Sequence, residues 1–452
     1  MSTPTSATPE PVPQPAVEPT PEETTTPPKE EEVESKPEAT NGKSETVTPI
    51  IDEAKEYMKR VRRRKMAIML SYCGQSYYGM QRNPETKTIE EELFNSFLKN
   101  NYFDEEAFKR PQLAQFQRAA RTDKHVSAAR QIVSVKIAET ISAEQLNEHL
   151  PPEIRVMGVK RVTQGFDAKK NCDARTYMYM TPTFAFAPID VPVTESYRIT
   201  PERIEEIRKT LNLYLGPKNF HNFTSRKRAH DPSAVRIIYS FTCSEPFEKD
   251  GLEYVLLRVR GQSFMMHQIR KMIGLVIAYM RGFANLETFT KCWTADRIDV
   301  PRAPGVGLLL DHVHYDRYDK RFGKDGMHDP MTWDSVEDKV QKFCDEYIFP
   351  VITQSENIEK SMMTWLNTLP YHTYDVREDH LHMMDEDERN INKADMSGIG
   401  KAFRAIVHRT GTEPKFCTKR IPGREDDSDD GEDDDDDEFL AAKKPKVQTA
   451  EG

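Results

Sequence analysis

Apolar and polar positions follow two periods along residues 66–183, and these periods predict strands and helices in turn. Residues 66–72 are almost entirely apolar, which predicts a buried strand. Residues 88–99 place apolar side chains at helical spacing behind Thr88, a residue type that caps helix N-termini. The remaining strands of this first cycle are predicted at 130–138, 154–162 and 175–183.

A second cycle of the same kind follows. Thr200 and Pro201 open a predicted helix whose apolar side chains recur on one face. Its later elements are two strands at 235–245 and 252–260, a long helix at 263–281 and a strand near 306–315. Strands that pair with the next strand along the chain, with helices on one side of the sheet, indicate an α+β fold. The more polar residues 317–416 are expected to form a mostly helical extension packed against it.

The two ends of the chain differ from this body in composition and charge. Residues 1–58 are rich in Pro, Glu, Thr and Ser, and residues 417–452 include the acidic run Glu425–Glu438, so both tails are predicted to be disordered. The whole chain has a formal charge of −10. Residues 1–58 and 424–452 each hold 4 basic and 13 acidic residues, which leaves +8 on the body. That balance is compatible with a polyanion-binding surface or with tails that only solubilise the chain.

Other composition signals narrow the class of protein. The six cysteines include no Cys-x-x-Cys pair, which favours a reducing intracellular compartment and predicts no metal site. The sequence has no Walker or dinucleotide-binding motif, and no apolar run long enough to cross a membrane. Basic clusters at Lys59–Lys65 and Lys443–Lys446 are typical of nuclear-import signals, although the first is also compatible with an RNA-contacting arm.

Asp123 is the first candidate for chemistry. It stands between Arg121, Lys124 and His125, directly before the strand predicted at 130–138. Positive neighbours favour the ionised carboxylate, which suits nucleophilic attack better than acid catalysis. A surface turn with an ordinary ion pair explains the same residues.

Three further segments combine aromatic or basic residues in a suggestive order. Tyr177 and Tyr179 alternate along a strand, so they form either a base-stacking face or ordinary core packing. Within the helix predicted at 263–281, His267, Arg270 and Lys271 are expected to share one face, from which one of them could reach Asp123. The segment 219–227 interleaves aromatic and basic residues, as nucleic-acid-binding loops do.

Taken in order, these segments resemble the TruA family of tRNA pseudouridine synthases, most closely its eukaryotic Pus1-type branch. The matching stretches, between residue 66 and about residue 370, are YCGQSYYGMQRN, RAARTDKHVSA, CDARTYMYMTPTFAFAP, NFHNFTS, GQSFMMHQIRKMIG and WLNTLP. The resemblance implies two α+β subdomains, 59–165 and 166–316, which form one extended antiparallel sheet with helices on one face and a central RNA-binding cleft.

The resemblance also implies a role for each candidate residue. Asp123 matches the catalytic aspartate, which attacks the ribose or the uracil ring. Tyr177 matches the tyrosine that stacks on the flipped uridine, and Arg270 matches the basic partner that keeps the aspartate ionised. Arg121 matches the arginine that holds the target nucleotide out of the helix. His125 stands where the family commonly has glycine, which puts the geometry of the turn in question.

The expected activity is the isomerisation of uridine to pseudouridine in tRNA, with snRNA and mRNA as further candidate substrates, and it requires no cofactor. We expect a nuclear monomer with no membrane association, and the sequence leaves a mitochondrial form open. The alternative is a catalytically inactive RNA-binding or RNA-folding protein on the same scaffold.

Overall fold

The computed structural model describes residues 62–225, 227–324 and 326–377. The two predicted tails, the cluster Lys443–Lys446 and the extension beyond residue 377 lie outside these residues. Within the described residues ten strands form one sheet. The strands are β1 (Arg63–Tyr72), β2 (Gln117–Arg118), β3 (Ser127–Ala138), β4 (Ile154–Arg161), β5 (Ala174–Pro182), β6 (Gly216–Asn219), β7 (Val235–Cys243), β8 (Phe247–Lys249), β9 (Leu252–Gly261) and β10 (Leu308–His314).

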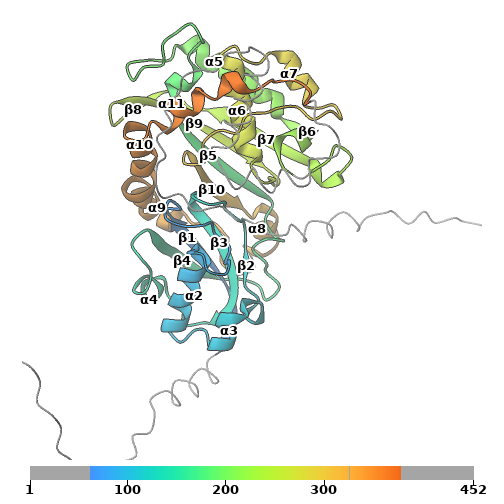
Figure 1. The fold of residues 1–452 in the computed structure, drawn as a ribbon. Helices are drawn as coiled ribbons and strands as arrows, with labels where there is room; N and C mark the ends of the chain where they lie inside the picture. The colour runs from blue at the N-terminus through green and yellow to red at the C-terminus, as the bar shows by residue number, and fades with distance from the viewer. Residues whose placement is uncertain (1–61, 226, 325, 378–452) are drawn as a thin grey trace, which may run out of the picture. The chain divides into compact units, whose positions relative to one another are not determined.

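The order of these strands confirms the predicted α+β fold with a large, mostly antiparallel sheet. The order is β4-β1-β3-β10-β5-β9-β7-β6, with β2 paired to β3 and β8 paired to β9 (Figure 1). Both predicted subdomains contribute to this sheet, while their boundaries stay a prediction. The sheet departs from the expected antiparallel pattern where β10 runs parallel to β3.

The position of β10 decides which earlier segments come together. Leu310 pairs with Ala128 of β3 on one side and with Tyr177 of β5 on the other. The last strand of the sheet in chain order therefore lies between the strand that follows Asp123 and the strand that carries Tyr177. Register across β10 sets the spacing of these two candidate residues.

Two of the three helices whose bounds the sequence predicts begin at the expected caps. The Thr88 side chain accepts from the backbone N–H of Glu91, and the Thr200 side chain accepts from that of Arg203, so both predicted N-caps are confirmed. The helices of the described residues are α2 (Ile89–Lys99), α3 (Glu105–Lys109), α4 (Ala143–Asn147), α5 (Pro201–Leu211), α6 (Gln268–Met280), α7 (Leu286–Lys291), α8 (Asp316–Phe322), α9 (Glu337–Phe343), α10 (Phe349–Asn357) and α11 (Ser361–Leu366). None of them combines the length and the apolar composition that a membrane span requires.

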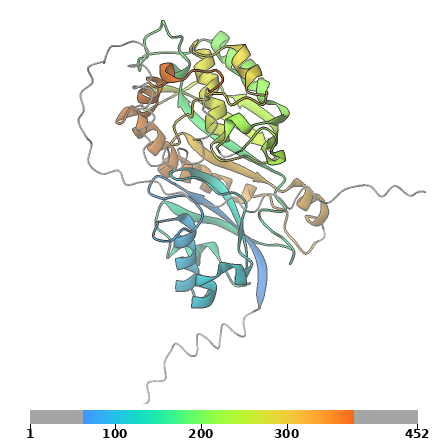
Figure 2. The same ribbon diagram turned by 45° about the vertical axis from the view of Figure 1, so that its right-hand side comes forward.

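The described part of the residues expected to form an extension packs against the sheet. Glu337 at the start of α9 forms an ion pair with Arg130 of β3, and α9 and α10 lie alongside the strands in both views (Figures 1 and 2). Glu337 also helps to line a hollow of about 500 Å³ with Thr176 and Met178. Thr176 and Met178 alternate with Tyr177 along β5, so they face the opposite side of the sheet. We expected helices on one face, and the extension adds helical cover to the second.

Candidate active site

The turn that carries Asp123 is held by the loop that follows β1. Met80 donates its backbone N–H to the carbonyl of Thr122 at 3.1 Å, and His125 donates to the carbonyl of Tyr77 at 3.2 Å. Gly79 has a φ of +108°, and a Cβ there would stand 2.9 Å from the Thr122 oxygen. Glycine is therefore required at position 79 both by its backbone conformation and by the close approach of the turn.

Side chains from β1 and β3 hold the segment that leads into this turn. Tyr72 and Thr122 share a hydrogen bond of 2.7 Å between their hydroxyl groups. Gln131 donates to the carbonyl of Ala120 at 2.7 Å and accepts from its N–H at 3.2 Å, so one amide side chain occupies both polar groups of that residue. The backbone on either side of Asp123 is thus determined by buried contacts, which a nucleophile needs for reproducible positioning.

His125 adopts the backbone conformation that glycine at this position would favour. Val126 donates to the carbonyl of Asp123 at 3.1 Å, which closes a turn over Lys124 and His125. His125 has a φ of +63°, whereas Lys124 does not have a positive φ, which is the pattern of a type II turn. The His125 ring Nδ1 lies 2.6 Å from the carbonyl oxygen of Gln75. The histidine therefore keeps the turn geometry, with a hydrogen bond that glycine could not form.

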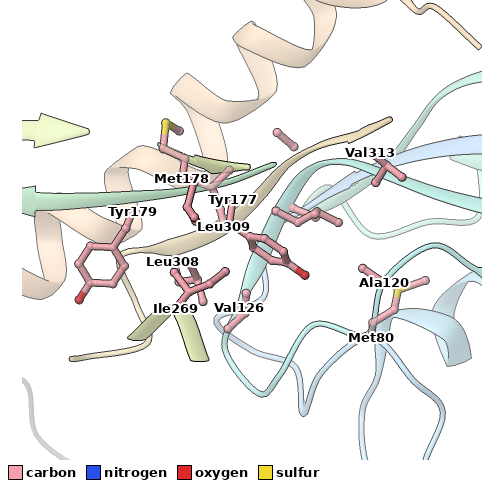
Figure 3. Packing of buried hydrophobic residues seen from close by; sticks show 14 of the residues in the cluster. Met80, Ala120, Val126, Tyr177, Met178, Tyr179, Ile269, Leu308, Leu309 and Val313 are labelled. Atoms are coloured by element: carbon pink, nitrogen blue, oxygen red, sulfur yellow. The ribbon is translucent and has the colours of Figure 1, made fainter. Parts of the chain in front are cut away.

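Tyr177 lies close enough to Asp123 for the carboxylate to affect it. Burial raises the pKa of Tyr177 to about 12; the positive charge of Arg175 opposes that rise, and the negative charge of Asp123 adds to it. The ring is 8% exposed and meets that of Phe264 edge to face, with centroids 5.3 Å apart. Figure 3 shows the Tyr177 hydroxyl directed toward the side on which Met80 and Ala120 lie. No described residue forms a hydrogen bond with this hydroxyl.

Tyr179 has a different environment, although it shares a face of β5 with Tyr177. Its hydroxyl donates to the carbonyl of Pro304 at 2.8 Å, and the residue is 1% exposed. Figure 3 shows its ring separated from that of Tyr177, with the hydroxyl pointing away. Core packing, the second of the two interpretations left open by the sequence, therefore applies to Tyr179, and the two tyrosines do not form a joint stacking platform.

Arg270 lies in the first turn of α6, beside Tyr179. Its Nε donates to the carbonyl of Ala303 at 2.7 Å, and its guanidinium carbon is 3.4 Å from the place of a Cβ on Gly305. Burial raises the pKa of Tyr179, and the positive charge of Arg270 opposes that rise. Arg270 therefore faces the side of the sheet that carries both tyrosines, while its pairing with Asp123 stays a prediction.

The helix predicted at 263–281 begins five residues later than expected, at Gln268. His267 has a φ of +60° and stands before α6, where a helix cannot continue backward through it. Lys271 is partly buried, its Nζ donates to the carbonyl of Asn222 at 3.4 Å, and burial lowers its pKa to about 7. His267 nevertheless lies near the two basic residues. Burial lowers its pKa, and the positive charges of Arg302, Arg270 and Lys271 lower it further.

The loop predicted at 219–227 does not present its aromatic rings for stacking. Phe220 and Phe223 are fully buried, and their rings pack against Tyr214 and Trp293. Asn222 is also buried and donates to the carbonyl of Cys292 at 3.0 Å. Residues 220–224 of this segment are therefore part of the core of the second half.

Arg121 is exposed next to the turn, and Lys124 places its Nζ 4.5 Å from the centre of the exposed Tyr78 ring.

Arg175 is a further residue at the site, and it is not among the candidates that the sequence predicts. Arg175 extends from β5 to the carbonyl of Ala119, with its Nε at 2.8 Å and its Nη2 at 2.5 Å. Arg175 lies two residues before Tyr177 and therefore on the same face of the strand, and this spacing is the sequence feature that could have indicated it.

Comparison with known proteins identifies the family. Residues 211–316, which include Arg270, match the family model described as tRNA pseudouridine synthase. The chain is 46% identical over 328 residues to the pseudouridylate synthase 1 homolog of Mus musculus, an alignment that covers 71% of this chain and 77% of the relative. The chain belongs to the TruA family of tRNA pseudouridine synthases.

Two other relatives extend the match to human and yeast. The human pseudouridylate synthase 1 homolog is 47% identical over 315 residues, which covers 68% of this chain and 74% of the relative. The tRNA pseudouridine synthase 1 of Yarrowia lipolytica is 32% identical over 445 residues, which covers 78% of this chain and 82% of the relative. The predicted resemblance to this family is confirmed.

Proposed function

We propose that this chain is an isomerase that converts specific uridines of tRNA to pseudouridine, with Asp123 as its nucleophile. Membership of the TruA family supports the reaction and the tRNA substrate. The observation that carries the role of Asp123 is its place on a rigid turn near Tyr177, where its charge acts on the buried ring. Tyr177 then stacks on the flipped base, and its hydroxyl lies at the same side of β5 as the turn.

The reaction needs no external atoms. Asp123 attacks either the ribose or the uracil ring, the glycosidic carbon–nitrogen bond breaks, and the detached base rotates. A new bond forms between the ribose carbon and C5 of the ring, and the bond to Asp123 breaks, which returns the free carboxylate. C5 then loses its proton, and the ring nitrogen that was bound to the ribose gains one. Extrusion of the uridine from a stacked helix costs a few kcal/mol, which contacts with the bound RNA must offset.

The charge of the body supports a polyanionic substrate. Residues 59–423 carry a formal charge of +8, and exposed Arg121 and partly exposed Lys124 flank the candidate nucleophile. We assign Arg121 to holding the displaced nucleotide and Arg270 to keeping Asp123 ionised. Structured regions of snRNA and mRNA are further candidate substrates, since shape and backbone contacts dominate recognition of folded RNA.

The decisive experiment measures tritium release from a tRNA transcript that carries uridine tritiated at C5. The wild-type chain should release tritium in proportion to the pseudouridine formed, and Asp123→Ala and Asp123→Asn should reduce the rate by at least about a thousandfold. Both variants should still bind the transcript. An inactive wild type that binds tRNA would favour an RNA-binding protein on this scaffold, and an active Asp123→Ala would remove the aspartate from the mechanism.

We place the protein in the nucleus as a monomer. The clusters Lys59–Lys65 and Lys443–Lys446 support import into the nucleus. Fluorescent fusions of the full chain, with each cluster replaced by Gln in turn, test the location and also detect a mitochondrial form. Light scattering of the purified chain, alone and with tRNA, tests the oligomeric state.

A further inference from the structure

Arg175 is the one side chain in the described residues for which hydrogen bonds to both the Asp123 segment and the loop beside Tyr177 are resolved. Its Nε and Nη2 donate to the carbonyl of Ala119, and its Nη1 donates to the carbonyl of Gln262 at 3.3 Å. Ala119 lies four residues before Asp123. Gln262 lies two residues before Phe264, whose ring packs edge to face against Tyr177.

The geometry of these bonds connects segments that the sheet keeps apart. β5 and β3 do not pair directly, because β10 lies between them. The Ala119 N–H donates to the carbonyl of Ile132 on β3 at 2.8 Å, so β3 holds the backbone of Ala119 in place. The Ala119 carbonyl accepts from Arg175. A planar guanidinium donates along several fixed directions at once, which an ammonium group cannot do.

We propose that Arg175 is a positioning residue, which fixes the distance between the Asp123 turn and the Tyr177–Phe264 pair so that the nucleophile meets the stacked uracil. The inference deepens the proposed function and depends on it. Arg175 acts through backbone carbonyls on both sides, so it is not itself a catalytic residue. A displacement of about 1 Å between reacting groups can reduce a rate by about a hundredfold. Loss of the guanidinium hydrogen bonds of Arg175, here called the fork, should therefore reduce turnover more than RNA binding.

Two substitutions separate the fork from the charge. Arg175→Lys keeps the positive charge but cannot reach Ala119 and Gln262 in the same geometry. Arg175→Gln keeps one amide donor and removes the charge. If the fork positions the two segments, both variants lose rate. If only Arg175→Gln loses rate, the charge alone matters and the positioning role is overturned.

Arg203 on α5 provides a matched control. Its Nη2 donates to the carbonyls of Phe186 and Met280, which also joins segments distant in sequence, and Met280 is at the opposite end of α6 from Arg270. Arg203→Lys should reduce stability by an amount comparable with Arg175→Lys. It should leave the chemical step unchanged at temperatures where both variants are folded.

The test compares single-turnover rates of pseudouridine formation, tRNA dissociation constants and melting temperatures of the full chains. Both Arg175 variants should lose at least about tenfold in rate, with dissociation constants within about threefold of wild type, while Arg203→Lys keeps its rate within about twofold. Equal rate losses in Arg175→Lys and Arg203→Lys, or a wild-type rate in Arg175→Lys, would overturn the proposal. A wild-type chain with no activity would instead overturn the proposed function.

Discussion

The backbone N–H of His125 donates to the carbonyl oxygen of Tyr77 at 3.2 Å, while the His125 ring lies 2.6 Å from the Gln75 carbonyl oxygen. One residue therefore fastens the Asp123 turn to the loop after β1 through both its backbone and its side chain. These bonds explain how a histidine is accommodated at a φ of +63°. The left-handed conformation costs a non-glycine residue about 1 kcal/mol or more, and a hydrogen bond to a backbone carbonyl contributes about as much.

Because these two terms nearly cancel, His125→Gly should change stability by less than about 1 kcal/mol and keep most of the activity. His125→Val should reduce both stability and activity much more than His125→Gly, since a β-branched residue at positive φ is strained. Chemical denaturation and tritium-release rates of the three chains measure both effects. Equal behaviour of the Gly and Val variants would show that the turn does not depend on this conformation.

The two tyrosines of β5 allow a matched pair of substitutions. Tyr177→Phe should leave the melting temperature nearly unchanged, because no described residue forms a hydrogen bond with its hydroxyl, yet it should reduce the rate of pseudouridine formation. Tyr179→Phe loses the bond to the Pro304 carbonyl and should destabilise the fold by about 1 kcal/mol, with little effect on rate. The reverse pattern would assign the chemical role to Tyr179.

Binding of tRNA should weaken steeply with salt. Each phosphate contact releases counterions, so the logarithm of affinity should fall linearly with the logarithm of salt concentration, by about tenfold or more between 50 and 200 mM. If Arg121 contacts a phosphate, Arg121→Gln should reduce the slope by about 0.7 to 0.9. Filter binding across a salt series measures the slope, and an unchanged slope would remove Arg121 from the phosphate contacts.

Stability should decrease as the pH falls below about 6.5. Burial lowers the pKa of His314 to about 4, and His312 and Arg260 add to that effect while Asp316 and Asp311 oppose it. An unfolded chain binds this proton near pH 6.5, so protons favour the unfolded state between about pH 6.5 and 4. The slope should stay well below the limit of about 1.4 kcal/mol per pH unit, because His314 is only partly buried.

Denaturation midpoints between pH 4 and 7.5 test this expectation. His314→Gln should show a shallower loss of stability than the wild type over that window. His149→Gln, a change at an exposed histidine, should reproduce the wild-type slope. Parallel curves for the wild type and His314→Gln would show that His314 makes no contribution.

Local patterns predicted most of the secondary structure because they depend on neighbours in sequence. The caps at Thr88 and Thr200 and the alternation along β5 were read correctly for that reason. The start of α6 was not, because tertiary bonds determine it. The Thr224 hydroxyl donates to the Met266 carbonyl at 2.9 Å and the Gln268 side chain accepts from the Met265 N–H, which stabilises an irregular segment with a helical apolar pattern.

The family motifs name each candidate residue, and those roles stay predictions, but the motifs do not show how the residues assemble. The sequence cannot distinguish a buried Phe220 from a stacking one, since both fit a loop rich in aromatic and basic residues. It also gives no sign that β10 pairs in parallel with β3, a contact between residues about 180 positions apart. The role of Arg175 follows only once that arrangement brings Ala119 and Gln262 within its reach.

The insertion of β10 also has a consequence for biosynthesis. A chain emerging from the ribosome can complete β1, β3 and β4 early, since these strands pair among themselves. β2 covers the second edge of β3 at Val133 and Ser134, but the part of that edge at Ser127 and Ala128 stays open until Leu308–His314 has been synthesised, more than 150 residues later. Activity therefore cannot arise in a nascent chain that ends before β10, and the open edge is where a chaperone or a mispaired strand has the longest time to bind.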